Sequence, residues 1–317
     1  MKNRFRRKLL YGLTVLLRAI FRNLPPSWGI GFGSFMGRFA FWAVPKERRK
    51  TLDHLRVAFS GEKSPKDILK IGENVFRNLG KTAAELIYFP KITEQTVDRW
   101  VSCEGLPKFD AVLKEGKGGI ILVAHLGNWE LLARSLALKG YGGVILARRV
   151  YDERFDRLLS EIRKVRGNSF LDRDESPKEF LKVLRQNHFM GILADQDIDS
   201  IDGIFVPFFG KEAYTPVAPA RFSMASGAPV IPCFMVREEN GRHRLVVEDP
   251  IWPPEGRASP GVKIPGGPPK GVDKEEAVFR LTQGWMAITE SYIRRYPDQW
   301  VWMHRRWKTR PENTNDK

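Results

Sequence analysis

The chain has 317 residues, 42% of them hydrophobic, which is enough for one large α/β domain or two smaller ones. Its two cysteines, Cys103 and Cys233, lie far apart, which argues against a disulfide framework or a cysteine metal cluster and suits a reducing, cytosol-facing setting. The 53 lysines and arginines against 37 acidic residues give a net charge of +16.

A surface this basic suits nucleic acid, anionic lipid or an acidic protein. Nine tryptophans and twenty phenylalanines favour the membrane surface among these partners. Aromatic rings combined with basic side chains suit the lipid headgroup region.

Residues 1–45 combine basic and apolar sequence. MKNRFRRK precedes two apolar runs, Leu9–Phe21 and Trp28–Val44, each with one arginine inside. Neither reaches the roughly 20 uncharged residues of a membrane span, and no small-residue cleavage site of a signal peptide follows the first. We expect retained amphipathic or shallow membrane-associating helices here, with ordinary core helices as the alternative, and a single domain over residues 46–317.

From residue 46 onward, helical and strand-like patterns alternate. Helices are expected within 46–100, mainly at 65–88, and at 108–115, 129–139, 152–166, 175–187, 215–226 and 274–295. Strands are expected at 119–124, 144–148, 189–194, 229–236 and 244–248, and the Pro- and Gly-rich stretch 252–270 predicts an irregular loop. The alternation indicates a three-layer α/β fold.

The segment GGIILVAHLGNWE, residues 118–130, carries the main chemical signal. An apolar strand stops at His125, Gly127 and Asn128 supply turn chemistry, and Glu130 lies in the first turn of the next helix. A histidine and a carboxylate at such a corner form a candidate general-base pair. This points to an enzyme that takes a proton from a hydroxyl and transfers a group to it.

A spacing of five residues is weak by itself, because His243 and Glu248 repeat it. That second pair lies in a strand-like segment, where an offset of five puts the side chains on opposite faces. A continuous helix would also separate such a pair, so His125 and Glu130 converge only if the chain turns at Gly127. A purely structural His125 is the alternative.

Further polar residues follow two predicted strands, where α/β proteins place ligand residues. Arg148 and Arg149 end one strand, and Asp195-Gln196-Asp197 follows another. The aspartates near residue 195 lack the glycine and final glutamate of an EF-hand loop, so no metal site is expected. The chain has no glycine-rich phosphate loop and no nucleophile elbow.

Two aromatic segments complete the set. DGIFVPFFG at 202–210 is predicted to be an apolar loop, and WMHRRW at 302–307 places His304, Arg305 and Arg306 between aromatic rings. Surface charge or core packing is the alternative for each group.

Together these segments resemble the lipid A late acyltransferases, the lauroyl and myristoyl transferases that add secondary acyl chains to a Kdo-lipid A precursor. HLGNWE, ARR, ADQD, GIFVPFFG and QWVWMHRRWKTRP occur in family order, with TLDHLRVAF near residue 51 and SGAPVIP near residue 226. The similarity covers about residues 5–311. The family belongs to the wider glycerolipid acyltransferases with a His-x4-Asp/Glu motif, and phosphatidylinositol mannoside acyltransferases share much of the pattern. The chain departs from the family at ADQDIDSID and at His54, which leaves acceptor choice open.

The resemblance implies a mixed sheet flanked by helices, an N-terminal membrane anchor at the cytoplasmic face of the bacterial inner membrane, and acyl carrier protein as donor. In the resulting hypothesis His125 takes the proton of a sugar-lipid hydroxyl, Glu130 orients the imidazole and Arg149 binds the oxyanion. Substrate binding is assigned to Asn128, Arg163, Asp195, Asp197, His304, Arg305 and Arg306. We expect no cofactor, and an anionic membrane surface but no nucleic acid as partner.

Two other interpretations stay open. One is an acyltransferase that uses acyl-CoA and acts on another glycolipid or a phospholipid, which a donor swap in a purified assay would separate. The other is a non-enzymatic basic membrane-surface or nucleic-acid-binding protein, for which His125 would be dispensable.

Overall fold

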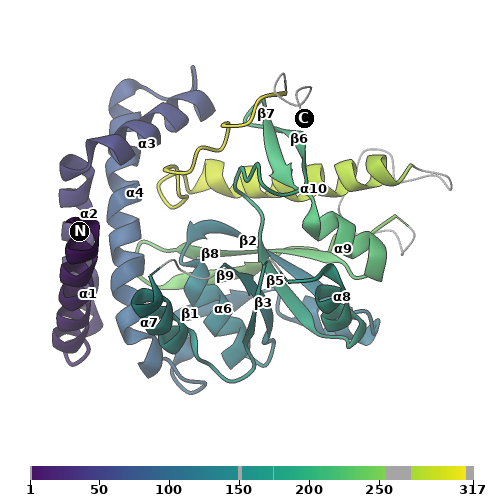
Figure 1. Ribbon diagram of the computed structural model, residues 1–317, viewed down its shortest axis with the longest axis horizontal. Coiled ribbons are helices and arrows are strands. Elements are labelled where there is room, and N and C mark those ends of the chain that lie inside the picture. Colours follow the sequence, from purple (N-terminus) through teal and green to yellow (C-terminus); the bar gives the residue numbers. More distant parts are fainter. Residues whose placement is uncertain (1, 149–151, 174, 255–272, 312–317) are drawn as a thin grey trace.

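A seven-stranded sheet forms the centre of the protein (Figure 1). The computed structural model describes residues 2–148, 152–173, 175–254 and 273–311, so most of the predicted loop at 252–270 lies outside the described residues. The strand order is β1-β9-β8-β2-β5-β3-β4, and every pair is parallel except β8 with β9. The strands are β1 Val101–Glu104, β2 Gly119–Gly127, β3 Gly143–Ala147, β4 Ser169–Asp172, β5 Phe189–Leu193, β8 Val230–Arg237 and β9 His243–Val247.

Helices cover both faces of this sheet. Strand β8 is buried along its whole length and β2 at every residue except His125, as expected for strands with helices on both sides. One face is covered by α8 (Pro177–Arg185), α9 (Ala218–Ser226) and α10 (Lys274–Arg295). The other is covered by α5 (Pro107–Lys114), α6 (Trp129–Leu138) and α7 (Glu153–Arg163). The prediction of a mixed α/β sheet flanked by helices is confirmed.

The N-terminal helices form a layer at the side of the sheet (Figure 1). They are α1 (Lys2–Phe21), α2 (Pro26–Ala43), α3 (Pro45–Ala58) and α4 (Pro65–Glu85), and the short 3-10 segments η1 (Leu86–Lys91) and η2 (Val97–Arg99) lead on to β1. Helix α4 begins with a capping box between Ser64 and Asp67.

Helix α2 packs closely on α4 through glycine. A Cβ added at Gly33 would lie 2.4 Å from the carbonyl oxygen of Gly80, so only glycine permits this approach. Outward, the same helix leaves Trp28, Phe35 and Phe39 more than half exposed. Within the described residues, no helix has both the length and the apolar character that crossing a membrane requires. Membrane association by this layer, and a domain boundary near residue 45, stay predictions.

Three local predictions are wrong. The stretch 202–210 is not a loop but part of an antiparallel hairpin of β6 (Gly203–Phe208) and β7 (Lys211–Pro216), so α9 begins only at Ala218. Residues at positive φ, Phe209 and Gly210, close its turn, and phenylalanine is an uncommon residue there. Strands β1 and β4 lie outside the predicted strands, and β2 runs past His125 to Gly127 because the C-terminal segment pairs with its end.

Candidate active site

The carboxyl ends of three parallel strands bring the polar residues of the site together. His125 lies near the end of β2, Asp195 follows β5 by two residues, and Arg148 follows β3. Strands β2 and β5 are direct neighbours in the sheet, and β5 is also paired with β3. Ligands of α/β proteins bind at such an edge.

His125 and Asp195 form the central contact of this edge. The Nδ1 atom of His125 lies 2.7 Å from Oδ1 of Asp195, while the backbone N–H of His125 donates to Oδ2 at 2.8 Å. The indole N–H of Trp300 donates to the same Oδ2 at 2.8 Å. Because a carboxylate only accepts, Nδ1 carries the proton and Nε2 is left with its lone pair. Gln196 Nε2 lies 3.2 Å from that Nε2.

The environment keeps Asp195 ionised. Burial alone would raise the pKa of this carboxyl, but the electrostatic attraction of the His125 ring and the hydrogen bonds from His125 and Trp300 outweigh it and lower the pKa to about 2. Asp195 is therefore a permanent anion at neutral pH, which fixes the tautomer of the ring and stabilises an imidazolium when one forms.

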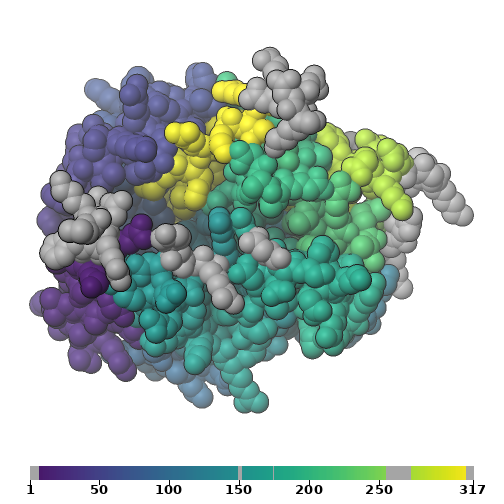
Figure 2. Space-filling model, in the orientation of Figure 1, coloured from purple at the N-terminus to yellow at the C-terminus, as the bar shows by residue number. Residues whose placement is uncertain are grey.

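The C-terminal segment closes one side of the site. The Val301 N–H donates to the His125 carbonyl at 3.1 Å, and the Gly127 N–H donates to the Gln299 carbonyl at 2.9 Å. Figure 2 shows this yellow segment against the teal surface of the middle of the chain. It brings His304 beside His125, with ring centroids 5.6 Å apart. Desolvation and the nearby His125 lower the pKa of His304.

Gly127 permits the turn that the sequence predicts, but the turn does not bring Glu130 onto the ring. Its φ is +61°, and a Cβ there would lie 1.8 Å from the Met235 carbonyl oxygen, so glycine is required. The Glu130 carboxylate is instead held by two hydrogen bonds from Arg163, one of them at 2.8 Å. The contact expected between Glu130 and His125 is thus replaced by one with Asp195, because β5 delivers a carboxylate directly beside β2.

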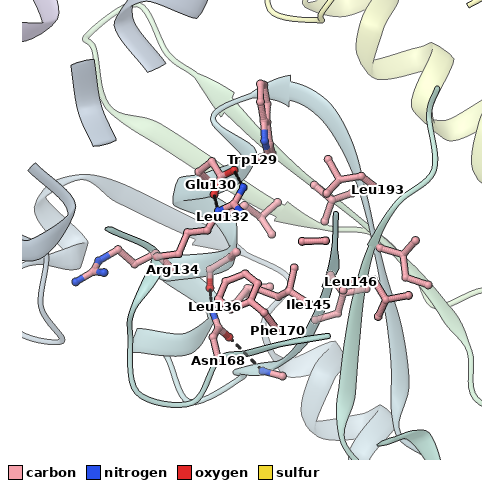
Figure 3. A pocket seen from close by; sticks show the side chains of 18 of the residues that line it. Trp129, Glu130, Leu132, Arg134, Leu136, Ile145, Leu146, Asn168, Phe170 and Leu193 are labelled. Carbon is pink, nitrogen blue, oxygen red and sulfur yellow. Dashed lines mark hydrogen bonds and ion pairs between the residues drawn. The ribbon is translucent and has the colours of Figure 1, made fainter. Parts of the chain in front are cut away.

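An apolar cavity of about 300 Å³ opens at His125 and extends between α6 and the sheet (Figure 3). Trp129 and Glu130 lie toward one end and Asn168 toward the other, with Leu132, Leu136, Ile145 and Phe170 between them. Asn168 closes its end by donating to the Ala133 carbonyl at 2.9 Å and accepting from the Gly143 N–H at 3.2 Å. This volume is at the lower end for small-molecule sites and suits a hydrocarbon chain more than a polar ligand.

Two of the residues assigned to substrate binding are buried structural residues instead. Asn128 is fully buried, where its side chain accepts from the Leu131 N–H to cap α6 and donates to Glu85 at 2.7 Å. Arg306 is also fully buried, and burial lowers its pKa to about 10. Its guanidinium donates to the Tyr214 carbonyl and the Thr215 hydroxyl, which joins the C-terminal segment to β7.

The other residues assigned to substrate binding lie in three different places: at the cavity, against the C-terminal segment and on the surface. Asp197 accepts from the backbone and hydroxyl of Thr309, both at 2.8 Å, and braces the C-terminal segment. Arg163 lines the cavity, and Arg305 is exposed. Arg149, the expected oxyanion donor, lies outside the described residues.

Gln196, Trp300 and Glu85 contribute to the site or its support, although the residue patterns described above assign them no role. Gln196 sits inside the ADQD segment, so its neighbours were a usable signal. Trp300 and Glu85 carry none, because one is an aromatic in a Trp-rich stretch and the other one of many helical glutamates. Their roles appear only when β2, α4 and the C-terminal segment meet.

The fold and the site define a class: a mixed α/β protein with a histidine–carboxylate pair beside a largely apolar cavity. The chain belongs to the bacterial lipid A biosynthesis acyltransferase family, whose sequence profile matches residues 2–309. It is therefore an acyltransferase that acts on a hydroxyl, and the recognised family is confirmed.

Named relatives agree with this assignment. The chain is similar to a lipid A biosynthesis lauroyltransferase of Escherichia coli (strain K12), at 26% identity over 95% of this chain and 91% of the relative. A lipid A biosynthesis myristoyltransferase of the same organism is 22% identical over 90% and 83%. A phosphatidylinositol mannoside acyltransferase of Mycobacterium tuberculosis (strain ATCC 25618 / H37Rv) is 27% identical over 48% of this chain and 50% of the length of that relative.

Proposed function

We propose that this protein transfers a fatty acyl chain from an acyl carrier protein thioester to a hydroxyl of a Kdo-lipid A precursor, at the cytoplasmic face of the bacterial inner membrane. The observation that carries the proposal is the His125–Asp195 pair at the mouth of the apolar cavity. The cavity takes the acyl chain, which leaves the thioester carbonyl beside the imidazole.

In the reaction, Nε2 of His125 accepts the proton of the acceptor hydroxyl as its oxygen attacks the thioester carbon. Asp195 stabilises the imidazolium through Nδ1. The tetrahedral intermediate then collapses, the carbon–sulfur bond breaks, and the departing thiolate takes the proton from His125. One ester bond forms, one thioester bond breaks, and no covalent acyl-enzyme is required.

The negative charge on the carbonyl oxygen needs a donor. We retain Arg149 for this role because it follows Arg148 in the sequence, and Arg148, directly after β3, lines the cavity. In this mechanism Glu130 holds Arg163 beside the cavity. The pairing also neutralises the Glu130 carboxylate, which would otherwise repel the developing oxyanion.

Charge and apolar surface support the partners. A net charge of +16 suits an acidic carrier protein and anionic lipid together. Helices α1 and α2 expose Leu9, Leu16, Trp28 and Phe39, which suits insertion into a bilayer where the acceptor resides. Acyl-CoA as donor and a mannoside glycolipid as acceptor form the second candidate, favoured by the phosphatidylinositol mannoside relative.

Mass spectrometry of lipid A, from cells with and without the gene, tests the acceptor. Loss of one secondary acyl chain, restored by the wild-type gene and not by His125→Ala, is the expected result. Unchanged lipid A would contradict the proposal. Purified enzyme given acyl carrier protein and CoA thioesters of one chain length decides the donor, with the carrier thioester expected to react faster.

Vesicle flotation at low and high salt tests the membrane attachment. The full-length protein should stay with the vesicles at high salt, because the apolar contribution to binding is not screened. Complete release by salt would leave only an electrostatic attachment and contradict the proposed insertion of α1 and α2.

A further inference from the structure

A second cavity, of about 720 Å³, opens between α2, α4 and the turn that joins β8 to β9. It shares no lining residue with the cavity at His125. Among the described residues that line it, five side chains are cationic and none is a carboxylate. The cations are Arg38, Arg77, Lys81, Arg99 and Arg242. Acyl transfer as described above uses none of them.

Protein groups neutralise little of this charge. Arg38 pairs with Glu73 at 3.2 Å, and 63% of its side chain is exposed. Arg77 donates to the uncharged hydroxyl of Ser34 at 3.3 Å. No carboxylate in the described lining neutralises the other guanidinium and ammonium groups, which leaves them free to meet an anionic ligand.

The side chains of the remaining three cations have few protein partners. The Arg242 guanidinium donates one hydrogen bond, at 2.7 Å, to the Asp98 carbonyl. Neither the Lys81 nor the Arg99 side chain makes a hydrogen bond or ion pair with a residue that the structure describes, although the carboxylates of Glu85 and Asp298 act on Lys81 from a distance. Lys81 is half-buried, and its pKa is lowered, first by burial and then by the repulsion of Arg237 and Arg77. A bound anion would relieve that repulsion.

An apolar stripe borders this cationic cavity. Trp28, Phe35, Phe39 and Trp42 are 66%, 64%, 59% and 55% exposed. Their spacings of seven, four and three residues place them along one face of α2. Phe35 also lines the cavity, so charge and hydrocarbon surface meet at one point.

We propose that this cavity binds the phosphate of an anionic membrane phospholipid, whose acyl chains lie along the exposed face of α2. A phosphate with attached hydrocarbon uses both the cations and the stripe, whereas inorganic phosphate uses only the cations. A docked protein suits this site less well than a lipid headgroup, because small ligands bind in concave pockets whereas protein interfaces bury about 800 Å² on each partner. The site gives membrane attachment a preference for anionic lipid, and it does not depend on the proposed acyl transfer.

Vesicle binding by full-length protein tests this site. The triple variant Lys81→Gln, Arg99→Gln, Arg242→Gln removes three cavity charges. The matched control Lys178→Gln, Arg185→Gln, Lys211→Gln removes three exposed charges from α8 and β7, outside the cavity lining. Partition is measured by flotation with phosphatidylcholine vesicles, with and without phosphatidylglycerol.

The cavity variant should lose about 100-fold in partition to the phosphatidylglycerol vesicles, since each cation near an anionic surface contributes about fivefold. Its partition to neutral vesicles should not change, and the control should lose far less. Equal losses in both triple variants would overturn the proposal, because general charge would then explain the binding. Should Lys81→Gln lower the unfolding temperature, the double variant of exposed Arg99 and Arg242 replaces the triple.

Titration separates the sources of phosphate. Dihexanoyl phosphatidylglycerol, below its micelle-forming concentration, should bind the wild type more tightly than inorganic phosphate does, and the cavity variant should bind neither. Equal affinity for both would overturn the lipid assignment. Normal flotation of the cavity variant with lost capture by acyl carrier protein would make the cavity a protein-docking surface and would also overturn it.

Discussion

Two histidines in this protein, His125 and His243, are each followed by a glutamate five residues later, but their surroundings differ. In neither case does that glutamate bind the histidine ring, because Glu130 binds Arg163 and Glu248 binds Tyr292. His125 contacts Asp195 at 2.7 Å, and His243 lies 3.4 Å from Glu85. Both partners come from other parts of the chain, so the spacing did not produce either pair.

Access to the cavity separates the two pairs. The His125 side chain is 21% exposed and lines the cavity, whereas His243 and Glu85 are almost completely buried. Glu85 also binds Arg237 and Asn128, so it joins α4 to β8 and to the cap of α6. Pairing with a carboxylate is therefore common to both histidines, and only His125 also lines a cavity, which makes it the candidate base of the proposed reaction.

The sharpest test of this contrast replaces each histidine in turn. We expect His125→Ala to lower kcat by about 10²–10⁴-fold with little change in unfolding temperature, because the general base is lost. His243→Ala should leave kcat of the folded enzyme close to wild type but destabilise the fold by about 1–3 kcal/mol, since Glu85 loses a buried partner. Steady-state rates and thermal unfolding measure both. A larger kcat loss for His243→Ala would reverse the assignment.

The next test compares the two carboxylates near His125. Asp195→Asn should approach the kcat loss of His125→Ala, because an amide no longer fixes the tautomer or stabilises the imidazolium. Glu130→Gln removes a charge-assisted hydrogen bond to Arg163, and we expect a loss of no more than about 10–100-fold. If Glu130→Gln were the more damaging change, Glu130 would have to reach His125 during turnover.

A third test examines the cavity at His125 through Gly191. A Cβ added there would meet Ile145 Cγ1 at 3.6 Å, which is ordinary contact, so the fold has room for a side chain. Gly191 shares the cavity face of β5 with Phe189 and Leu193. Gly191→Val should therefore lower kcat/KM for long acyl donors by about 10–200-fold and spare short ones. Competition between donors of different acyl-chain length measures this effect. An equal loss for all chain lengths would show that the cavity does not hold the acyl chain.

Acid unfolding should show what the two pairs have in common. Burial would raise the pKa of each carboxyl, but the partners of Asp195 and Glu85 outweigh it and lower the pKa of both to about 2. Groups with a lowered folded-state pKa stabilise the fold above their unfolded pKa, and this stability is lost as pH falls from about 4 to about 2. Asp195→Asn should weaken this pH dependence in urea unfolding, with up to about 2 kcal/mol at stake. An unaltered pH profile would show that the pair adds no net stability.

Local sequence patterns were sufficient for most of the fold. The apolar runs of β2 and β8 are buried almost throughout, and β5 is partly open only toward the cavity, so such runs can be recognised without knowledge of their neighbours. The same patterns placed His125 near one strand end and Asp195 just after another. Because parallel strands end at one edge, both residues were expected near the site, which the structure shows.

Only the tertiary structure decided which groups meet. Asp195 reaches His125 because β5 lies beside β2, and strand order is not encoded in residue spacing. The structure also buries Asn128 and Arg306, polar residues that the sequence suggests are exposed to ligand. The periodicity of side chains indicates the type of a single element and which of its faces is buried. A hydrogen bond between two elements depends instead on how those elements pack. For this reason the sequence pointed to His125 as the candidate base, and the packing of β5 beside β2 supplied Asp195 as its partner.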